Sequence, residues 1–251
     1  MTSGPHPYRF FGLLFLLSIP FWLLGALGAS DLLPGLPISA IMAVCPAIAG
    51  GLLIWHAGGS APLTAFLRRA GDCAKMRPWA WGVALGTMPI VMVLSAAFLV
   101  FSGMVLPPPE IDPLQVLALF ALFFVAATAE ELGWTGYATR PLVEAHGFLR
   151  ASLIIASVSV VWHVIPLLQV GRGWEWIAWW ALGTSSRRVI IVWLYVRGGE
   201  SVFSASLFHA MSNLSWMLFP VMGSHYDPIS TALILVIFAV VAVSLKARKR
   251  P

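Results

Sequence analysis

The fold of this chain is constrained most by eight apolar stretches, each about as long as a membrane-spanning helix of roughly 20 residues. They are Phe10–Leu27, Ile38–Trp55, Trp79–Val105, Leu114–Tyr137, Leu149–Leu168, Trp174–Val196, Ser201–Met222 and Ile229–Leu245. The first stretch exceeds the apolar core of a signal peptide, about 7–15 residues, so we expect a retained span. The pattern predicts an all-α polytopic integral membrane protein, a bundle of about eight transmembrane helices.

The composition excludes most soluble classes of protein. Of 251 residues, 15 are Lys or Arg and 10 are Asp or Glu, so only 10% are charged, while 59% are hydrophobic. A soluble domain has about 25% charged residues because its surface faces water. Soluble globular, disordered, collagen-like and disulfide-scaffold proteins are therefore excluded. We expect residues 1–251 to form a single membrane-embedded domain, with a motif-bearing core at about 114–222.

The basic residues indicate the orientation of the bundle. Apart from Arg172, Arg187 and Arg188, every Lys and Arg lies in or beside the N-terminal segment, the C-terminal segment or one of three connections. These connections follow the second, fourth and sixth predicted spans. These residues define the basic end: Arg9, Arg68, Arg69, Lys75, Arg77, Arg140, Arg150, Arg197, Lys246, Arg248, Lys249 and Arg250. Because Lys and Arg concentrate on the cytoplasmic side of membranes, we expect both termini in the cytoplasm. The basic surplus then faces anionic membrane lipids and not nucleic acid.

Two other features are interpreted as contacts with the membrane surface. The segment Leu63–Arg69 is basic and amphipathic, so we expect it to lie on the inner membrane surface. Four tryptophans at the start of the sixth span are interpreted as an aromatic belt without a chemical role. They are Trp174, Trp176, Trp179 and Trp180.

A small set of polar side chains lies inside the predicted spans, where such residues are costly and usually functional. It comprises Glu130 and Glu131 in the fourth span, His163 in the fifth, Arg187 and Arg188 in the sixth, and His209 and Asn213 in the seventh. With a helical rise of 1.5 Å per residue, the glutamates, histidines and arginines lie about 14–21 Å from the basic end. Their common depth predicts one shared polar cavity.

The two adjacent glutamates should have different roles. Neighbouring residues on a helix point about 100° apart, so Glu130 and Glu131 cannot both face one atom. We expect one of them to carry out chemistry and the other to pair with Arg187 or Arg188. The arginine pair is accordingly interpreted as a structural counter-charge.

A carboxylate and two histidines near one point suit two hydrolytic designs. In the first, Glu130, His163 and His209 bind a catalytic zinc ion that keeps one position open for water. In the second, the glutamate is a general base that activates water directly, while histidine and asparagine side chains orient the water and stabilise the oxyanion. Neither an HExxH zinc motif nor a GxSxG serine elbow is present.

Three segments resemble the motifs of a known family, the CPBP intramembrane metalloproteases. This family includes CAAX prenyl protease 2-like enzymes and bacteriocin-processing and self-immunity proteins. Glu130–Tyr137, with the sequence EELGWTGY, is similar to its first motif, and Trp162-His163 followed by Pro166 is similar to its second. Val192–Gly199 leading to Leu207–Asn213 is similar to its third. The three motifs follow one another in the family's order.

The resemblance implies a role for each matching residue. Glu130 would be the general base for the attacking water, assisted by His163. His209 and Asn213 would form the oxyanion site or, with the other two, a metal site. The residues in supporting roles would be Glu131, Trp134 and Arg188.

Two residues depart from the family pattern. The usual first motif is EExxxR, and Thr135 stands at the position of its arginine. Arg140 lies five residues later on a different helical face and cannot replace that arginine. The second motif is often FxxxH, and Ser159 stands at its aromatic position. Both departures concern substrate positioning, above all for a CAAX substrate with a free carboxylate.

We therefore predict an intramembrane endopeptidase of the plasma membrane that hydrolyses a membrane-associated protein or peptide. Substrate is expected to reach the site through a cavity open toward the cytoplasm or the inner leaflet. The alternative is a non-catalytic bacteriocin-immunity or membrane-partner-binding protein. A proton-coupled transporter is a third hypothesis, because intramembrane Glu and His residues also form proton relays. The absence of a visible sequence repeat argues against it.

Overall fold

A computed structural model describes residues 6–28, 31–109 and 111–247 of the chain. Within these residues the protein is helical and contains no β-strand apart from an isolated bridge between Leu33 and Leu36. The helices are α1 (Pro7–Ala26), η1 (Ile38–Val44), α2 (Cys45–Gly58), α3 (Ser60–Arg68), η2 (Arg69–Gly71), η3 (Cys73–Lys75), α4 (Pro78–Phe101), α5 (Pro113–Glu131), η4 (Leu132–Thr139), α6 (Arg140–His146), α7 (Phe148–Gln169), α8 (Trp174–Gly198), α9 (Val202–Met217) and α10 (Pro228–Ala247). The prediction of an all-α polytopic protein is confirmed.

Each of the eight predicted spans corresponds to a helix or to a pair of consecutive helices. Among the described residues, six helical segments are long and apolar enough to cross a membrane by length and composition. The two predicted spans outside this set are α8, which contains four charged residues, and α9, which has only 16 residues. These two helices carry the intramembrane arginines, His209 and Asn213, so the polar site itself makes them less apolar than their neighbours.

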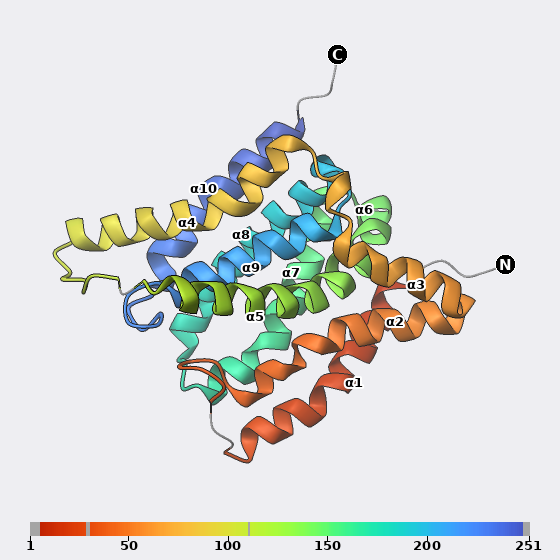
Figure 1. Ribbon diagram of the computed structural model, residues 1–251, viewed down its shortest axis with the longest axis horizontal. Coiled ribbons are helices and arrows are strands. Elements are labelled where there is room, and N and C mark those ends of the chain that lie inside the picture. The colour runs from red at the N-terminus through yellow and green to blue at the C-terminus, as the bar shows by residue number, and fades with distance from the viewer. Residues whose placement is uncertain (1–5, 29–30, 110, 248–251) are drawn as a thin grey trace.

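The helices are packed side by side, with α8 and α9 surrounded by the others (Figure 1). Helix α9 packs against α5 and α4, and α8 packs against α7 and α10. The start of α1, the short helices α3 and α6, and the end of α10 lie at the same end of the bundle, toward the top and the right in Figure 1. This is the basic end, although Arg248, Lys249 and Arg250 lie outside the described residues. The connections α1–η1, α4–α5, α7–α8 and α9–α10 form what we call the opposite end.

The sequence pattern predicted a uniform α-helix for the fourth span, but the structure differs there. It changes at Leu132 into the eight-residue π-helix η4, directly after the two glutamates. π-Helical turns are rare and frequent at functional sites. Here the change accompanies a close helix contact, because a Cβ atom added at Gly133 would lie 2.5 Å from the carbonyl oxygen of Pro46 in α2. Hydropathy gave no indication of this contact.

We expect Gly133→Ala to destabilise the protein strongly. The new methyl group would meet backbone atoms of Pro46, which cannot move aside without shifting α2, and such overpacking typically costs about 1–3 kcal/mol. Gly136→Ala is the matched control in the same π-helix, since its Cβ would lie 3.4 Å or more from its neighbours. Thermal unfolding of the purified protein in detergent measures both variants. Equal unfolding midpoints for the two would contradict this account of the contact.

Candidate active site

A cavity of about 590 Å³ lies among α5, α7, α8 and α9. The intramembrane polar residues that line it come from all four helices: Glu130, His163, Arg187, Arg188, His209 and Asn213. The structure therefore brings together side chains that are separated by up to 83 positions in the sequence. Two predicted site residues, Glu131 and Trp134, are fully buried beside the cavity and do not line it.

The two glutamates have different environments. Glu130 lines the cavity, is 7% exposed and makes no hydrogen bond within the described part of the chain. Its Oε2 atom is buried without a partner. Glu131 has no exposed surface, and both of its oxygens are hydrogen-bonded. Glu130 is therefore the carboxylate that remains available to a molecule in the cavity.

Glu131 is the centre of a buried polar network. Arg188 donates two hydrogen bonds to it, at 2.8 Å to Oε2 and 3.0 Å to Oε1. The Oγ1 atom of Thr135 also donates to Oε2, and the Nδ1 atom of His209 lies 3.0 Å from Oε1. The two parallel hydrogen bonds from Arg188 to Glu131 are the strongest form of arginine–carboxylate pair. Arg188 from α8 thus supplies a guanidinium group to the motif that has Thr135 at its usual arginine position.

The hydrogen bonds of the two histidines indicate which ring nitrogen carries the proton and which can accept a hydrogen bond. The Nδ1 atom of His163 lies 2.8 Å from the carbonyl oxygen of Ser159, and a carbonyl can only accept. His163 therefore carries its proton on Nδ1, which leaves a lone pair on Nε2. His209 likewise donates from Nδ1 to the Arg188-paired carboxylate of Glu131. Its Nε2 atom donates only when the ring is protonated.

Trp134 reaches the site indirectly. Its indole packs edge-on against Trp162, with ring centroids 5.8 Å apart, and Trp162 packs edge-on against His163 at 4.7 Å. Trp162 is held in turn by a 2.7 Å hydrogen bond from Nε1 to Ser18 in α1. Trp134 does not line the cavity itself, but it packs against Trp162, the residue directly before His163. This position is compatible with the supporting role expected for Trp134.

The predicted metal ligands do not form a metal-binding group in this arrangement. Among the described residues, no three His, Cys, Asp or Glu side chains are placed so that they could hold one ion. The Nδ1 atom of His209 lies 3.0 Å from Glu131, and the Oε2 atom of Glu130 has no hydrogen-bond partner among the described residues. The residues present therefore do not fit the predicted zinc site, and we derive no reaction step through a metal.

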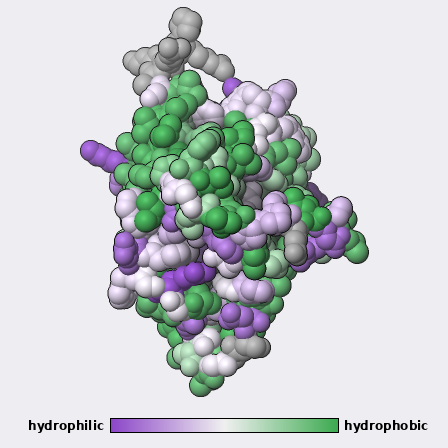
Figure 2. Space-filling model, turned by 90° about the vertical axis from the view of Figure 1, so that its left-hand side faces the viewer, coloured by the Kyte–Doolittle hydropathy of each residue, from purple (hydrophilic) through white to green (hydrophobic). Residues whose placement is uncertain are grey.

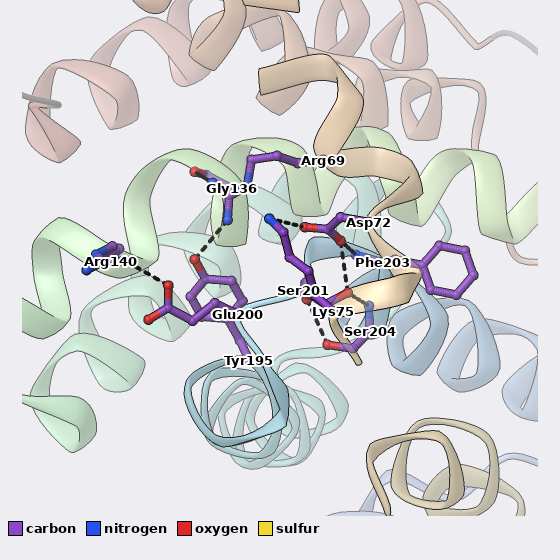
Figure 3. A network of polar contacts seen from close by, with 10 residues as sticks. All are labelled: Arg69, Asp72, Lys75, Gly136, Arg140, Tyr195, Glu200, Ser201, Phe203 and Ser204. Atoms are coloured by element: carbon purple, nitrogen blue, oxygen red, sulfur yellow. Dashed lines mark hydrogen bonds and ion pairs between the residues drawn. The ribbon is translucent and has the colours of Figure 1, made fainter. Parts of the chain in front are cut away.

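The basic end of the bundle is closed by the segment that follows α3 (Figure 3). Asp72 accepts hydrogen bonds from Ser201 at 2.9 Å and from the backbone N–H of Phe203 at 3.0 Å, at the start of α9. Arg69 donates to the carbonyl oxygen of Gly136 in η4 and, at 2.8 Å, to the hydroxyl of Tyr195 in α8. These contacts join α8, α9 and η4 beneath the site.

The cavity extends to the opposite end and not to the basic end. Its lining includes Leu32, Leu33, Gly35–Pro37, Arg172 and Tyr226 from connections of the opposite end, but no described residue from 59–77, 140–147 or 197–201. Figure 2 looks onto the opposite end and shows hydrophilic residues between hydrophobic surfaces. The expected opening at the basic end is therefore wrong, because contacts such as those of Arg69 and Asp72 fill that end. The alternative expectation, an opening toward the inner leaflet, stays a prediction.

The cavity also reaches the side of the bundle. Ile41 and Val44 of η1 line it and are 40% and 39% exposed, while Leu122 and Val125 of α5 line it and are 51% and 70% exposed. η1 and α5 are in contact with each other. The cavity thus meets the apolar outer surface between these two helices, where lipid would surround a protein in a membrane.

Sequence reasoning missed part of the cavity wall. Trp176 and Trp180, interpreted as an aromatic belt, line the cavity, and the Trp180 ring lies 5.4 Å from that of His163. Thr184 and Tyr226 also line it. The signal was the spacing of four residues that runs from Arg188 through Thr184 and Trp180 to Trp176, which places all of them on one face of α8.

Comparisons with known proteins match the part of the chain that carries this site. Residues 112–215 match the sequence model of a family described as Type II CAAX prenyl endopeptidase Rce1-like. The protein CAAX prenyl protease 2 from Methanococcus maripaludis is 27% identical over 154 residues, which are 53% of this chain and 56% of the relative. The chain therefore aligns with little more than half of that relative's length. The matched segment contains every predicted site residue from Glu130 to Asn213.

Proposed function

We propose that this chain, which belongs to the CPBP family through its Rce1-like segment at residues 112–215, is an intramembrane endopeptidase. The proposed substrate is a membrane-associated protein or peptide, and a prenylated CAAX peptide is the first to test. The observation that carries the proposal is the unpartnered carboxylate of Glu130, which faces a cavity shared with two histidines and an asparagine.

In the proposed reaction, Glu130 takes a proton from a water molecule as the water oxygen attacks the scissile carbonyl carbon. The Nε2 lone pair of His163 accepts the other water hydrogen and so orients the nucleophile. The amide of Asn213, and His209 when protonated, donate to the oxyanion of the tetrahedral intermediate. The C–N bond then breaks, and the proton held by Glu130 passes to the leaving amine. Water is consumed and no other reactant is needed.

The hydrogen bonds around the two histidines support the roles proposed for them. His163 is fixed by Ser159, and His209 is fixed by Glu131, so neither imidazole has to find its orientation during the reaction. Fixed donors in an enclosed site stabilise developing charge more than water does. The Oε2 atom of Glu130 forms no hydrogen bond with the described residues, so it is available to accept one from the water.

The proposal includes a plasma-membrane location with both termini in the cytoplasm and with lipids as surrounding partners. The distribution of basic residues supports this orientation. In this orientation the cavity opens laterally to the lipid and toward the non-cytoplasmic end. The exposed apolar residues at the side opening suit a substrate that carries a hydrocarbon chain.

The function is tested by incubating the purified full chain with a fluorogenic prenylated CAAX peptide and identifying the products by mass spectrometry. We expect cleavage of a peptide bond on the C-terminal side of the prenylated cysteine, with one oxygen atom from water in the new carboxylate. Binding of the peptide without cleavage would instead favour the non-catalytic partner-binding alternative. Uptake driven by a pH gradient in proteoliposomes, without cleavage, would favour transport.

The predicted zinc ion is tested in the same preparation. The metal content of the purified protein is measured by mass spectrometry. Its peptide cleavage is measured in parallel, with and without a chelator. Because the arrangement of Glu130, His163 and His209 does not form a metal-binding group, we expect cleavage to persist in the protein free of metal. Loss of activity on chelation and its recovery with zinc alone would overturn the metal-free mechanism.

A further inference from the structure

Arg187 is a charged side chain of the cavity that the proposed hydrolysis does not use. It is partly exposed and lines the cavity from α8, next to the paired Arg188. No carboxylate lies within 4 Å of its guanidinium among the described residues. A charge in such an enclosed place is costly unless an opposite charge compensates it.

The hydrogen-bond partners of Arg187 are neutral, and Glu130 of the same cavity attracts it electrostatically without forming a hydrogen bond. One terminal nitrogen donates to the hydroxyl of Ser212 at 2.7 Å, and the other donates to the hydroxyl of Thr184 at 2.6 Å. Tyr226 from the α9–α10 connection lies near enough to interact with it, but burial raises the pKa of that phenol and keeps it neutral. A guanidinium has five N–H groups, so donors remain for a further acceptor.

The cavity as a whole carries more positive than negative charge. Its charged lining residues are Arg172, Arg187, Arg188 and Glu130. Arg188 is neutralised by Glu131 behind the wall, whereas Arg172 lies over the ring of Trp176, with its guanidinium carbon 4.6 Å from the ring centroid. The two remaining cations face a single carboxylate, which the reaction itself requires. The balance favours a ligand with a negative charge.

Ser212 links Arg187 to the reacting centre. It directly precedes Asn213, and it lies three residues after His209 on α9. Because Arg187 is hydrogen-bonded to this residue, its free donors are held close to the proposed oxyanion site. An anionic group bound there would lie a short, fixed distance from the bond to be cleaved.

We propose that Arg187 binds the C-terminal carboxylate of the substrate and thereby selects a scissile bond close to a free C-terminus. This inference rests on the proposed peptidase function and adds a substrate requirement to it. A planar guanidinium matches a carboxylate through two parallel hydrogen bonds. Arg187 would thus provide in α8 a cationic contact for substrate, in a chain whose first motif has Thr135 and not arginine.

The experiment compares two prenylated CAAX peptides that differ only in their C-terminus, one a free acid and one an amide. For the wild-type chain we expect kcat/KM to be about 10- to 100-fold higher for the acid, the range for hydrogen bonds to a charged group. Arg187→Gln should remove this preference by slowing only the acid, and Arg187→Lys should restore part of it. Because the ratio is taken within each variant, partial loss of folded protein cancels.

Arg197→Gln is the matched control, since Arg197 lies on the same helix at the basic end, does not line the cavity, and donates a hydrogen bond to the carbonyl oxygen of Leu245. It should keep the wild-type preference. Equal cleavage of both peptides by the wild type, or an equal loss for both in Arg187→Gln, would overturn the inference. Binding of the two peptides is measured in parallel. An Arg187-dependent preference for the acid in binding, without any cleavage, would support the subsite and defeat the peptidase proposal.

Discussion

Replacing Glu130 with glutamine should abolish peptide cleavage while the fold is kept. Glutamine has nearly the shape of glutamate, but it cannot take a proton from water. Loss of a positioned general base typically lowers the rate by about 10²- to 10⁴-fold, so we expect kcat to fall by at least that range. Single-turnover cleavage of the prenylated peptide, with matched amounts of folded wild-type and variant protein, measures the change.

The stability of this variant is an independent part of the prediction. In the wild type, one oxygen of Glu130 is buried without a hydrogen-bond partner, which is unfavourable for a charged group. Removing the charge should therefore leave the unfolding midpoint unchanged or raise it. Glu175→Gln, on an exposed turn of α8, is the control for loss of a carboxylate and should retain activity. Full activity in Glu130→Gln, or a loss explained by unfolding alone, would contradict the assignment of Glu130 as the base.

Replacing Arg188 with methionine should have the largest effect on stability. Arg188 is 5% exposed and is paired through two hydrogen bonds with Glu131, which has no exposed surface. Removing one partner of a buried ion pair leaves an uncompensated charge and typically costs about 3–5 kcal/mol. Activity should fall as well, because Glu131 also orients His209.

A double variant separates the charge effect from loss of packing. Glu131→Gln combined with Arg188→Met removes both charges, so it should be more stable than Arg188→Met alone. Arg140→Gln is the comparison on the surface, because its ion pairs with Glu144 and Glu200 are exposed, and it should not change the unfolding midpoint measurably. If Arg188→Met were no less stable than Arg140→Gln, the buried pair would not have the structural role assigned to it.

Glu130 and Glu131 illustrate how much of the site the sequence could predict. Their position inside an apolar span identified both as functional candidates, and the motif order related Glu130 to His163, His209 and Asn213. Adjacency implied that only one glutamate could face the reaction. Which one faces the cavity depends on how α5 is rotated about its own axis, and hydropathy is uniform around such a helix.

The arginines show the same limit. The sequence predicted that one glutamate would pair with Arg187 or Arg188, and the structure selects Glu131 and Arg188. Two neighbours on α8 therefore differ in role: Arg188 forms a buried ion pair, whereas Arg187 faces the cavity and forms no ion pair within 4 Å among the described residues. This difference arises from tertiary contacts: Arg188 meets Glu131 of α5, 57 positions away, and Arg187 meets Ser212 of α9, 25 positions away.

By itself the sequence determined the helical membrane class, the positions of the spans and most of the polar residues of the site. These properties are local, because the cost of a polar group in a span depends on the span itself. Only the tertiary structure decided that Arg188 and not Arg187 pairs with Glu131, that the cavity opens away from the basic end, and that Trp176, Trp180 and Tyr226 form part of its wall. Those properties depend on the contacts that close one end of the bundle and on the rotation of each helix, which arise only when all the helices pack together.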